Sequence, residues 1–350
     1  MNIRRHLSVA AVAGTSVLGL LTLSACSPSA TGRTADGKLK VTASFYPMEF
    51  LAEQIGGKHV EVTDLTKPGV EPHDLELTPK QTARLGESGA IVYLKGLQPA
   101  VDDAVKQSGV QHVADAAALT SLEKHGTEVG GHDHAAGDEH GGEQSHGDED
   151  GGEHKDGHED GHEGHAEEGH SHSEAEGGND PHIWLDPVKY AEVAKGVNKT
   201  LAEADPEHKA DYQKNTDALV AKLNGLHKEF QDGLKNRATG TFITTHAAFG
   251  YLAERYGLTE EAISGLDPES EPSANRIKGL QALATKHHVS TVFFETIANP
   301  ATAKTLAGDL KLKTDVLDPI EGINDKSRGR DYFGVQRANL AALQKALGSK

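Results

Sequence analysis

A segment of some fifty residues between His125 and Asp180 consists almost entirely of His, Asp, Glu and Gly. It holds eleven of the chain's 21 His, eighteen acidic residues and one Lys. This composition cannot build a hydrophobic core, but imidazoles on a flexible tether are good ligands for zinc, copper and nickel. The alternative is an acidic, solvated linker with incidental His, which the abundance of His disfavours. We expect secondary metal sites at His132, His134, His140, His146, His154, His158, His162, His165, His170 and His172.

Four further metal-capable side chains lie where predicted strands end. His73 stands in the segment PGVEPHDLELTP, and His182 in DPHIWLDP, directly after the His-rich segment. His246 and Asp318 each follow the last residue of an apolar run that is typical of a strand. Because ligands bind outside the carboxyl ends of parallel strands, we expect these four side chains to converge.

The donor types in this set favour zinc. Cys26 is the only cysteine, so the exported protein has no thiolate ligand to offer and a site must use His, Asp and Glu. Three imidazoles and one carboxylate would complete a tetrahedral Zn²⁺ shell, whereas Mn²⁺ prefers more oxygen and is the second choice. Each residue also has an ordinary role open to it: a surface His for His73, a helix-capping residue for His246, and an Asx turn before Pro319 for Asp318.

Short β-branched runs alternate with amphipathic patterns, which indicates an α/β fold with parallel sheets in two lobes. Turn signals and Gly or Pro residues separate the runs. The predicted strands are 39–45, 60–65, 90–94 and 111–113 in the first lobe, and 241–245, 262–264, 289–294 and 314–317 in the second. The predicted helices around them are 48–55, 248–256, 273–287, 301–310 and 332–347.

One long helix is predicted over 206–236, between the lobes. Apolar residues recur there at spacings of three, four and seven, and no interior Pro breaks the pattern. Its length would be roughly 45 Å, and a single stiff helix predicts little motion on ligand binding. The predicted division is therefore an N-terminal lobe over 38–205 that contains the loop 125–180, the linker helix, and a C-terminal lobe over 237–350.

The first 25 residues resemble a lipoprotein signal peptide. Arg4 and Arg5 precede an apolar stretch, and the sequence LSAC that ends at Cys26 is typical of a lipobox. A transmembrane helix is the alternative, but Gly and Ser residues interrupt the apolar stretch. We expect lipidation at Cys26, a flexible tether over 26–37, and an extracytoplasmic protein anchored to the cell membrane.

The charge distribution argues against nucleic-acid binding, and the motifs argue against a zinc hydrolase. The formal net charge is −18, and segment 125–180 carries nearly all of it, so the rest of the chain is close to neutral. Without a basic surface, nucleic-acid binding is not expected. The sequence has no H-E-x-x-H motif and no nucleophile elbow, so a zinc hydrolase is a weaker hypothesis than a binding protein, and we expect no enzyme activity.

Several motifs together resemble one known family, the zinc-binding lipoproteins of bacterial ABC transporters, within the solute-binding proteins specific for zinc and manganese. The motifs are SFYPMEFLAEQIGG, PGVEPHDLELTP, the His-rich insert, DPHIWLDP, THAAFGYLAERYGL, VFFETIANPATAKTLA and VLDPI. The resemblance covers residues 38–347 and implies two lobes with four-stranded sheets joined by one long helix.

The resemblance also implies a site and partners. His73, His182 and His246 take the places of the family's three His ligands, and Asp318 that of the fourth ligand, with Glu71, Glu295 or water as alternatives. Glu295 also begins a helix, where its charge suits the helix dipole. The implied function is capture of Zn²⁺ and its delivery to an ABC permease and its ATPase by a monomer. A manganese receptor and a metal-storage or adhesin lipoprotein are the alternatives.

Overall fold

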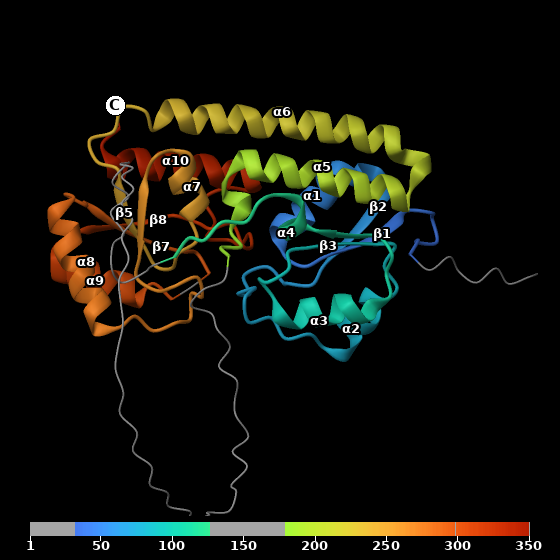
Figure 1. Cartoon of the computed structure of the whole chain (residues 1–350), viewed down its shortest axis with the longest axis horizontal. Coiled ribbons are helices and arrows are strands. Elements are labelled where there is room, and N and C mark those ends of the chain that lie inside the picture. Colours follow the sequence, from blue (N-terminus) through green and yellow to red (C-terminus); the bar gives the residue numbers. More distant parts are fainter. Residues whose placement is uncertain (1–31, 127–178, 298, 350) are drawn as a thin grey trace, which may run out of the picture.

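The computed structural model describes residues 32–126, 179–297 and 299–349 (Figure 1). The signal peptide, the lipidation residue Cys26 and the ten predicted loop ligands from His132 to His172 lie outside these residues. Within the described ranges, no helix is both long and apolar enough to cross a membrane.

The first lobe is built on a parallel sheet with strand order β2-β1-β3-β4. Helices lie on both of its faces in Figure 1, so its two central strands are buried, except at Lys40, and one of them, AIVY, is a continuous apolar run. The strands are β1 (Leu39–Ala43), β2 (Val60–Asp64), β3 (Ala90–Tyr93) and β4 (Val113–Asp115). The helices are α1 (Tyr46–Gly56), α2 (Pro79–Leu85), α3 (Pro99–Ser108) and α4 (Ala116–Leu119), with a 3₁₀ turn η1 (Gly57–His59).

The second lobe repeats the arrangement with strand order β6-β5-β7-β8, again all parallel. The strands are β5 (Thr241–Thr244), β6 (Thr259–Ala262), β7 (Thr291–Phe294) and β8 (Lys313–Val316). The helices are α7 (Gly250–Arg255), α8 (Ala274–Lys286), α9 (Ala301–Leu310) and α10 (Tyr332–Leu347). The predicted fold class, two α/β lobes with parallel four-stranded sheets, is confirmed.

Strand β6 lies three residues earlier than predicted. Its sequence, TEEA, is polar and does not look like a strand. It pairs with β5 along all four of its residues, and the carboxylate of the half-buried Glu260 accepts hydrogen bonds from Thr244 Oγ1 (2.8 Å) and from the backbone N–H of Phe249 (2.9 Å). An acid with two donors is stable at a sheet edge where the hydrophobic pattern predicts none.

Two long helices run beside each other along the molecule, α5 (Pro187–Ala204) and α6 (Lys209–Gly233), and α6 extends over both lobes (Figure 1). The 25 residues of α6 span about 37 Å, less than predicted, because the turn before it, η3 (Pro206–His208), is 3₁₀ and the helix ends at Gly233. Helix α5 was not predicted. It begins with Pro187 behind the side chain of Asp186, which accepts from the N–H of Val188 at 2.9 Å.

One hydrophobic core continues from lobe to lobe. The ring of Phe50 on α1 lies 5.4 Å from the ring of Tyr332 on α10, and the ring of Tyr190 on α5 lies 4.8 Å from that same ring, measured between centroids. All three side chains belong to a single cluster that also includes the buried face of α6. Burial of such aromatic rings at the interface opposes any movement that separates the lobes.

Candidate metal centre

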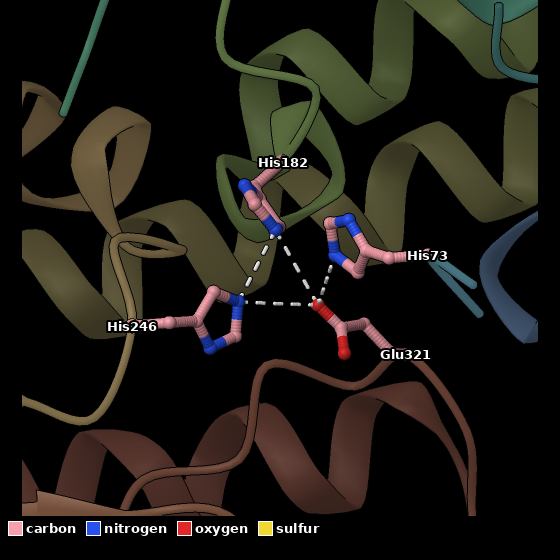
Figure 2. A group of neighbouring side chains, drawn as sticks. All are labelled: His73, His182, His246 and Glu321. Atoms are coloured by element: carbon pink, nitrogen blue, oxygen red, sulfur yellow. Dashed lines mark hydrogen bonds and ion pairs between the residues drawn. The ribbon is translucent and has the colours of Figure 1, made fainter. Parts of the chain in front are cut away.

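Four side chains from distant parts of the sequence meet between the lobes: His73, His182, His246 and Glu321. Figure 2 shows three imidazole nitrogens directed at one carboxylate oxygen of Glu321. One ligand atom from each of the four lies within 4.8 Å of the ligand atoms of the other three.

The distances fit a tetrahedral metal shell. The Nε2 atoms of His73, His182 and His246 each lie 3.4 Å from Glu321 Oε1, and the Nε2 atoms of His182 and His246 are 3.4 Å apart. Four donors around zinc, with bonds of about 2.0–2.1 Å, are separated by about 3.3–3.4 Å along each edge of the tetrahedron. Four of the six edges of the tetrahedron therefore already have the length that a zinc ion requires.

The sheet topology explains why these residues meet. His246 follows β5, Glu321 comes after β8, and His73 lies in the loop after β2, all beyond the carboxyl ends of parallel strands. This edge of an α/β sheet is where ligands bind. The side chains of His182, His246 and Glu321 are fully buried, while that of His73 keeps 12% of its surface exposed.

Carboxylates behind the centre fix two of the three rings. Asp180 Oδ1 lies 2.7 Å from His182 Nδ1, and Glu295 Oε1 lies 2.7 Å from His246 Nδ1. A carboxylate on Nδ1 places the proton there and leaves Nε2 free to bind a metal. Glu295, which was predicted as an alternative ligand, has this supporting role in the structure.

The segment around His182 is locked in place by its neighbours. Asp180 Oδ1 also accepts from the backbone N–H of His182 at 2.9 Å, and a 3₁₀ turn, η2 (Ile183–Leu185), follows with all three side chains buried. Trp184 Nε1 donates to the carbonyl of Pro319 at 2.7 Å. This hydrogen bond ties the segment that carries His182 to the turn that carries Glu321.

The structure places Asp318 outside the group of four, so Asp318 was the wrong choice for the fourth position. Its carboxylate accepts from Thr296 Oγ1 (2.9 Å) and from the backbone N–H of Ile320 (2.8 Å), which makes it the Asx-turn residue that was its alternative role. Ile320 has φ of +60°, a costly conformation for a β-branched residue. That turn reverses the chain and brings Glu321 into the centre.

Glu321 was not among the predicted candidates. It stands three residues after Asp318 in VLDPIEG, with no strand end or motif of its own to mark it. The other predicted alternative, Glu71, lies close by: its Oε1 is 4.0 Å from His73 Nε2 and accepts from the backbone N–H of His73 at 3.1 Å. Glu71 therefore borders the group without belonging to it.

Charge in the centre is concentrated on Glu321. Burial opposes its ionisation, but hydrogen bonds with His182, His246 and His73 outweigh burial and hold the pKa of Glu321 well below its usual range. For His182, burial works against protonation, yet Asp180 and Glu321 raise its pKa to about 9. For Glu71, burial first and then repulsion by Glu321 raise the pKa to about 8. The centre thus holds one strong anion and rings that release protons when a cation replaces them.

One oxygen of Glu321 is an unpaired acceptor in the described part of the chain. Its Oε2 is buried and has no hydrogen-bond partner. A buried charged carboxylate with one unpaired oxygen is costly, and a cation bound at Oε1 would lower that cost by neutralising part of the charge. A divalent cation, three neutral imidazoles and the Glu321 carboxylate would together carry one net positive charge. The carboxylates of Asp180 and Glu295, which lie behind His182 and His246, offset that charge.

Comparison with known proteins agrees with this geometry. The family model described as "ZnuA: Zinc-uptake complex component A periplasmic" matches residues 41–346. The chain belongs to the ZnuA family. A high-affinity zinc uptake system protein ZnuA of Bacillus subtilis is 34% identical over 333 residues, which cover 93% of this chain and 94% of that protein.

Other ZnuA-family relatives are longer. The zinc-binding lipoprotein AdcA of Streptococcus pneumoniae is 33% identical over 330 residues, 93% of this chain but 58% of AdcA. The chain thus spans little more than half the length of that relative. The crystal structure of Zn(II)-bound AdcA from Streptococcus pneumoniae is 28% identical, with a TM-score of 0.67, and the match covers 90% of this chain and 59% of that one.

Proposed function

We propose that the protein captures Zn²⁺ outside the cytoplasm in the cage of His73, His182, His246 and Glu321 and delivers it to a membrane ABC permease. The observation that carries this proposal is the set of four 3.4 Å separations between donor atoms, which match the edges of a zinc tetrahedron. Family membership and the zinc named in the relatives support the same cargo.

The donor set supports zinc over manganese. Three of the four donors are imidazole nitrogens, and Mn²⁺ favours oxygen-rich octahedral shells. The cage is buried and filled by four protein donors, which suits tight binding and leaves no position for the activated water of a hydrolase. A receptor, not an enzyme, is therefore the function that this arrangement serves.

The remaining parts of the proposal concern location and partners. The lipobox at Cys26 supports a lipid anchor. The predicted tether 26–37 is too long at its C-terminal end, because Gly32 bridges to Ser88 and Arg33 forms an ion pair with Asp205 at 2.8 Å. The partners are an ABC permease and its ATPase, and the receptor acts as a monomer. The ten His from 132 to 172 serve as weaker secondary zinc sites.

A pair of substitutions tests the cage. Glu321→Gln removes the only charged donor, so zinc affinity of the full chain should drop sharply. Asp318→Asn should leave it within a few-fold, because the Asp318 side chain contacts its own turn, Thr296 and Ser327 and none of the four cage residues, and asparagine can keep the turn. Trp184 is the only tryptophan and its ring lies 5.2 Å from that of His182, so its fluorescence reports zinc in the cage. Equal losses in the two variants would refute Glu321 as a ligand.

Delivery is tested in cells. A strain that carries the Glu321→Gln chain in place of the parent should take up less labelled zinc at limiting supply, and the Asp318→Asn strain should match the parent. If the Glu321→Gln strain took up zinc normally, the receptor function would be wrong even if binding in solution were lost.

A further inference from the structure

A second group of metal-capable side chains lies apart from the cage, where the His-rich segment leaves and rejoins the described chain. Glu123, His125 and Glu254 each offer a ligand atom, and these atoms lie within 4.8 Å of one another. Glu123 and His125 stand just before the segment, and Glu254 lies on α7 of the second lobe. None of the three belongs to the cage described above.

The frame that holds this group is built from buried hydrogen bonds. The backbone N–H of Asp180 donates to the carbonyl of Glu123 at 2.8 Å, so the two ends of the segment lie side by side. The hydroxyl of Tyr251 accepts from the backbone N–H of Glu123 (2.8 Å) and donates to the carbonyl of Asp180 (2.8 Å). The group therefore has a fixed place in the fold.

His125 is oriented in the same way as the cage ligand His182. Asp180 places one oxygen 2.7 Å from His182 Nδ1 and its other oxygen 2.9 Å from His125 Nδ1. In both rings Nε2 then faces a carboxylate: Glu321 for His182, and Glu254 at 3.0 Å for His125. A carboxylate on Nδ1 is the usual orienting partner of a metal-binding His, whose Nε2 is then directed at the ion.

Close packing confirms that His125 occupies a prepared position. Its ring lies 4.5 Å from the ring of Tyr251, edge to face. A Cβ at Gly250 would come within 2.4 Å of His125 Cβ, so only glycine at 250 admits His125 there. The side chain of His125 is 18% exposed, and that of Glu254 is 61% exposed, so an ion reaches the group from solvent.

The local charge favours a cation. Glu123, Glu254 and Asp180 bring three carboxylates together, and the one cation among the described residues that contacts them, Lys189, lies 2.7 Å from Glu123 Oε1. One nitrogen and two carboxylates suit zinc or a similar divalent ion better than Ca²⁺ or Mg²⁺, which take oxygen ligands throughout. With three protein donors and an exposed side, solvent would complete the shell, as at sites that exchange their ligands.

We infer that Glu123, His125 and Glu254 form a second, exchangeable Zn²⁺ site at the root of the His-rich segment, sharing Asp180 with the cage. The inference uses no residue of the cage as a ligand, so it stands or falls separately from the proposed function.

Anomalous scattering at the zinc edge tests the inference directly. Crystals of the full chain grown with excess zinc should show one peak in the cage and a second about 2.0–2.2 Å from His125 Nε2 and from a Glu254 oxygen. A peak in the cage without the second would overturn the inference and leave the proposed function intact. A second peak without one in the cage would support the inference and contradict the proposed function.

A count of bound zinc in solution provides the matched test. After equilibrium dialysis of the full chain, His125→Ala and Glu254→Gln should each retain about one zinc fewer per chain than the parent. His287→Ala, which removes an exposed imidazole far from the group, should retain the parental number. Glu254→Gln keeps a hydrogen-bonding amide opposite His125, so a fold defect is avoided; unchanged zinc in both test variants would refute the site.

Discussion

The two sides of the zinc cage are held with different firmness. His182 and His246 are fully buried, and each has a carboxylate on Nδ1. His73 lies on a loop, is 12% exposed, and in the described part of the chain its ring hydrogen-bonds only to Glu321. The three buried donors, His182, His246 and Glu321, therefore form a preorganised side of the cage, which we call the wall. His73 forms the side at which an ion can enter or leave. Capture and release then need movement of one loop and no separation of lobes that share a core.

The largest effect should come from breaking the wall. His246→Ala leaves Glu295 buried without its imidazole partner and opens a hole that is closed to solvent, so zinc affinity should fall by more than the ~100-fold upper range for loss of an orienting partner. Competition titration followed by Trp184 fluorescence would measure it, with the exposed His287→Ala as control. If tight binding survived His246→Ala but vanished on removal of residues 127–178, a storage protein would be the better description.

Removal of the exposed donor should have a smaller effect. In His73→Ala, water can replace the lost imidazole at the open side, so the affinity should drop less than in His246→Ala. The loss should appear mainly as faster release, measured by stopped-flow transfer of zinc to a chelator. Equal affinities and equal release rates in the two variants would remove the distinction between wall and entry side.

A smaller loss of affinity is expected from a change at Glu295, the carboxylate that orients the ring of His246. Glu295→Gln keeps the shape and a hydrogen-bond acceptor for His246 but removes the charge that fixes the ring, so a loss of about 10–100-fold in zinc affinity is expected. Glu229→Gln, on a surface ion pair with Arg337, is the matched control. An affinity like that of the parent would show that Glu295 does not orient the ligand.

The smallest effect on zinc affinity should come from a change of one pH unit. The pKa of His182 is about 9 without metal, so below that pH zinc must displace a proton, and affinity should fall about tenfold per pH unit for each proton displaced. Because the pKa of His182 is raised in the folded state, protonated His182 stabilises the metal-free protein against unfolding. This contribution is present in full below about pH 6.5 and is lost as the pH rises through about 9.

The zinc-loaded protein should show the opposite trend over that range, since binding strengthens as pH rises. Thermal unfolding of both forms at several pH values would measure this. Parallel trends in the two forms would contradict protonation of His182 in the metal-free state, and Asp180→Asn should reduce the difference between them because Asp180 helps to raise that pKa.

His73 and His246 could be predicted from the sequence because they follow strands whose carboxyl ends lie at one edge of a parallel sheet, and His182 from its place directly after the His-rich segment. The choice between Asp318 and Glu321 could not. It depends on a left-handed turn at Ile320 that directs one carboxylate into the turn and the other into the cage, and no local propensity indicates φ of +60° for isoleucine. The turn is imposed by packing: Ile320 is buried, and Asn339 holds the backbone of Asp318 at both its N–H and its carbonyl.

The fold was predictable where hydrophobic periodicity was strong, as in β1, α9 and α10, and less so where polar contacts decide. Helix α5 begins with a capping aspartate and a proline that also fit a loop, and β6 has the polar sequence TEEA, in which Glu260 accepts a hydrogen bond from Thr244. The role of Glu295 behind His246, instead of on the metal, depends on a distance between two strand ends that sequence spacing does not give.

The core that passes from α1 through α5 and α6 to α10 makes the two lobes one cooperative folding unit. Heat or denaturant should therefore unfold the chain in a single transition, and zinc bound in the cage should raise the melting temperature of both halves together. A gene cut between the lobes would yield two fragments that expose aromatic surface and aggregate, so neither half could serve alone as a minimal zinc sensor.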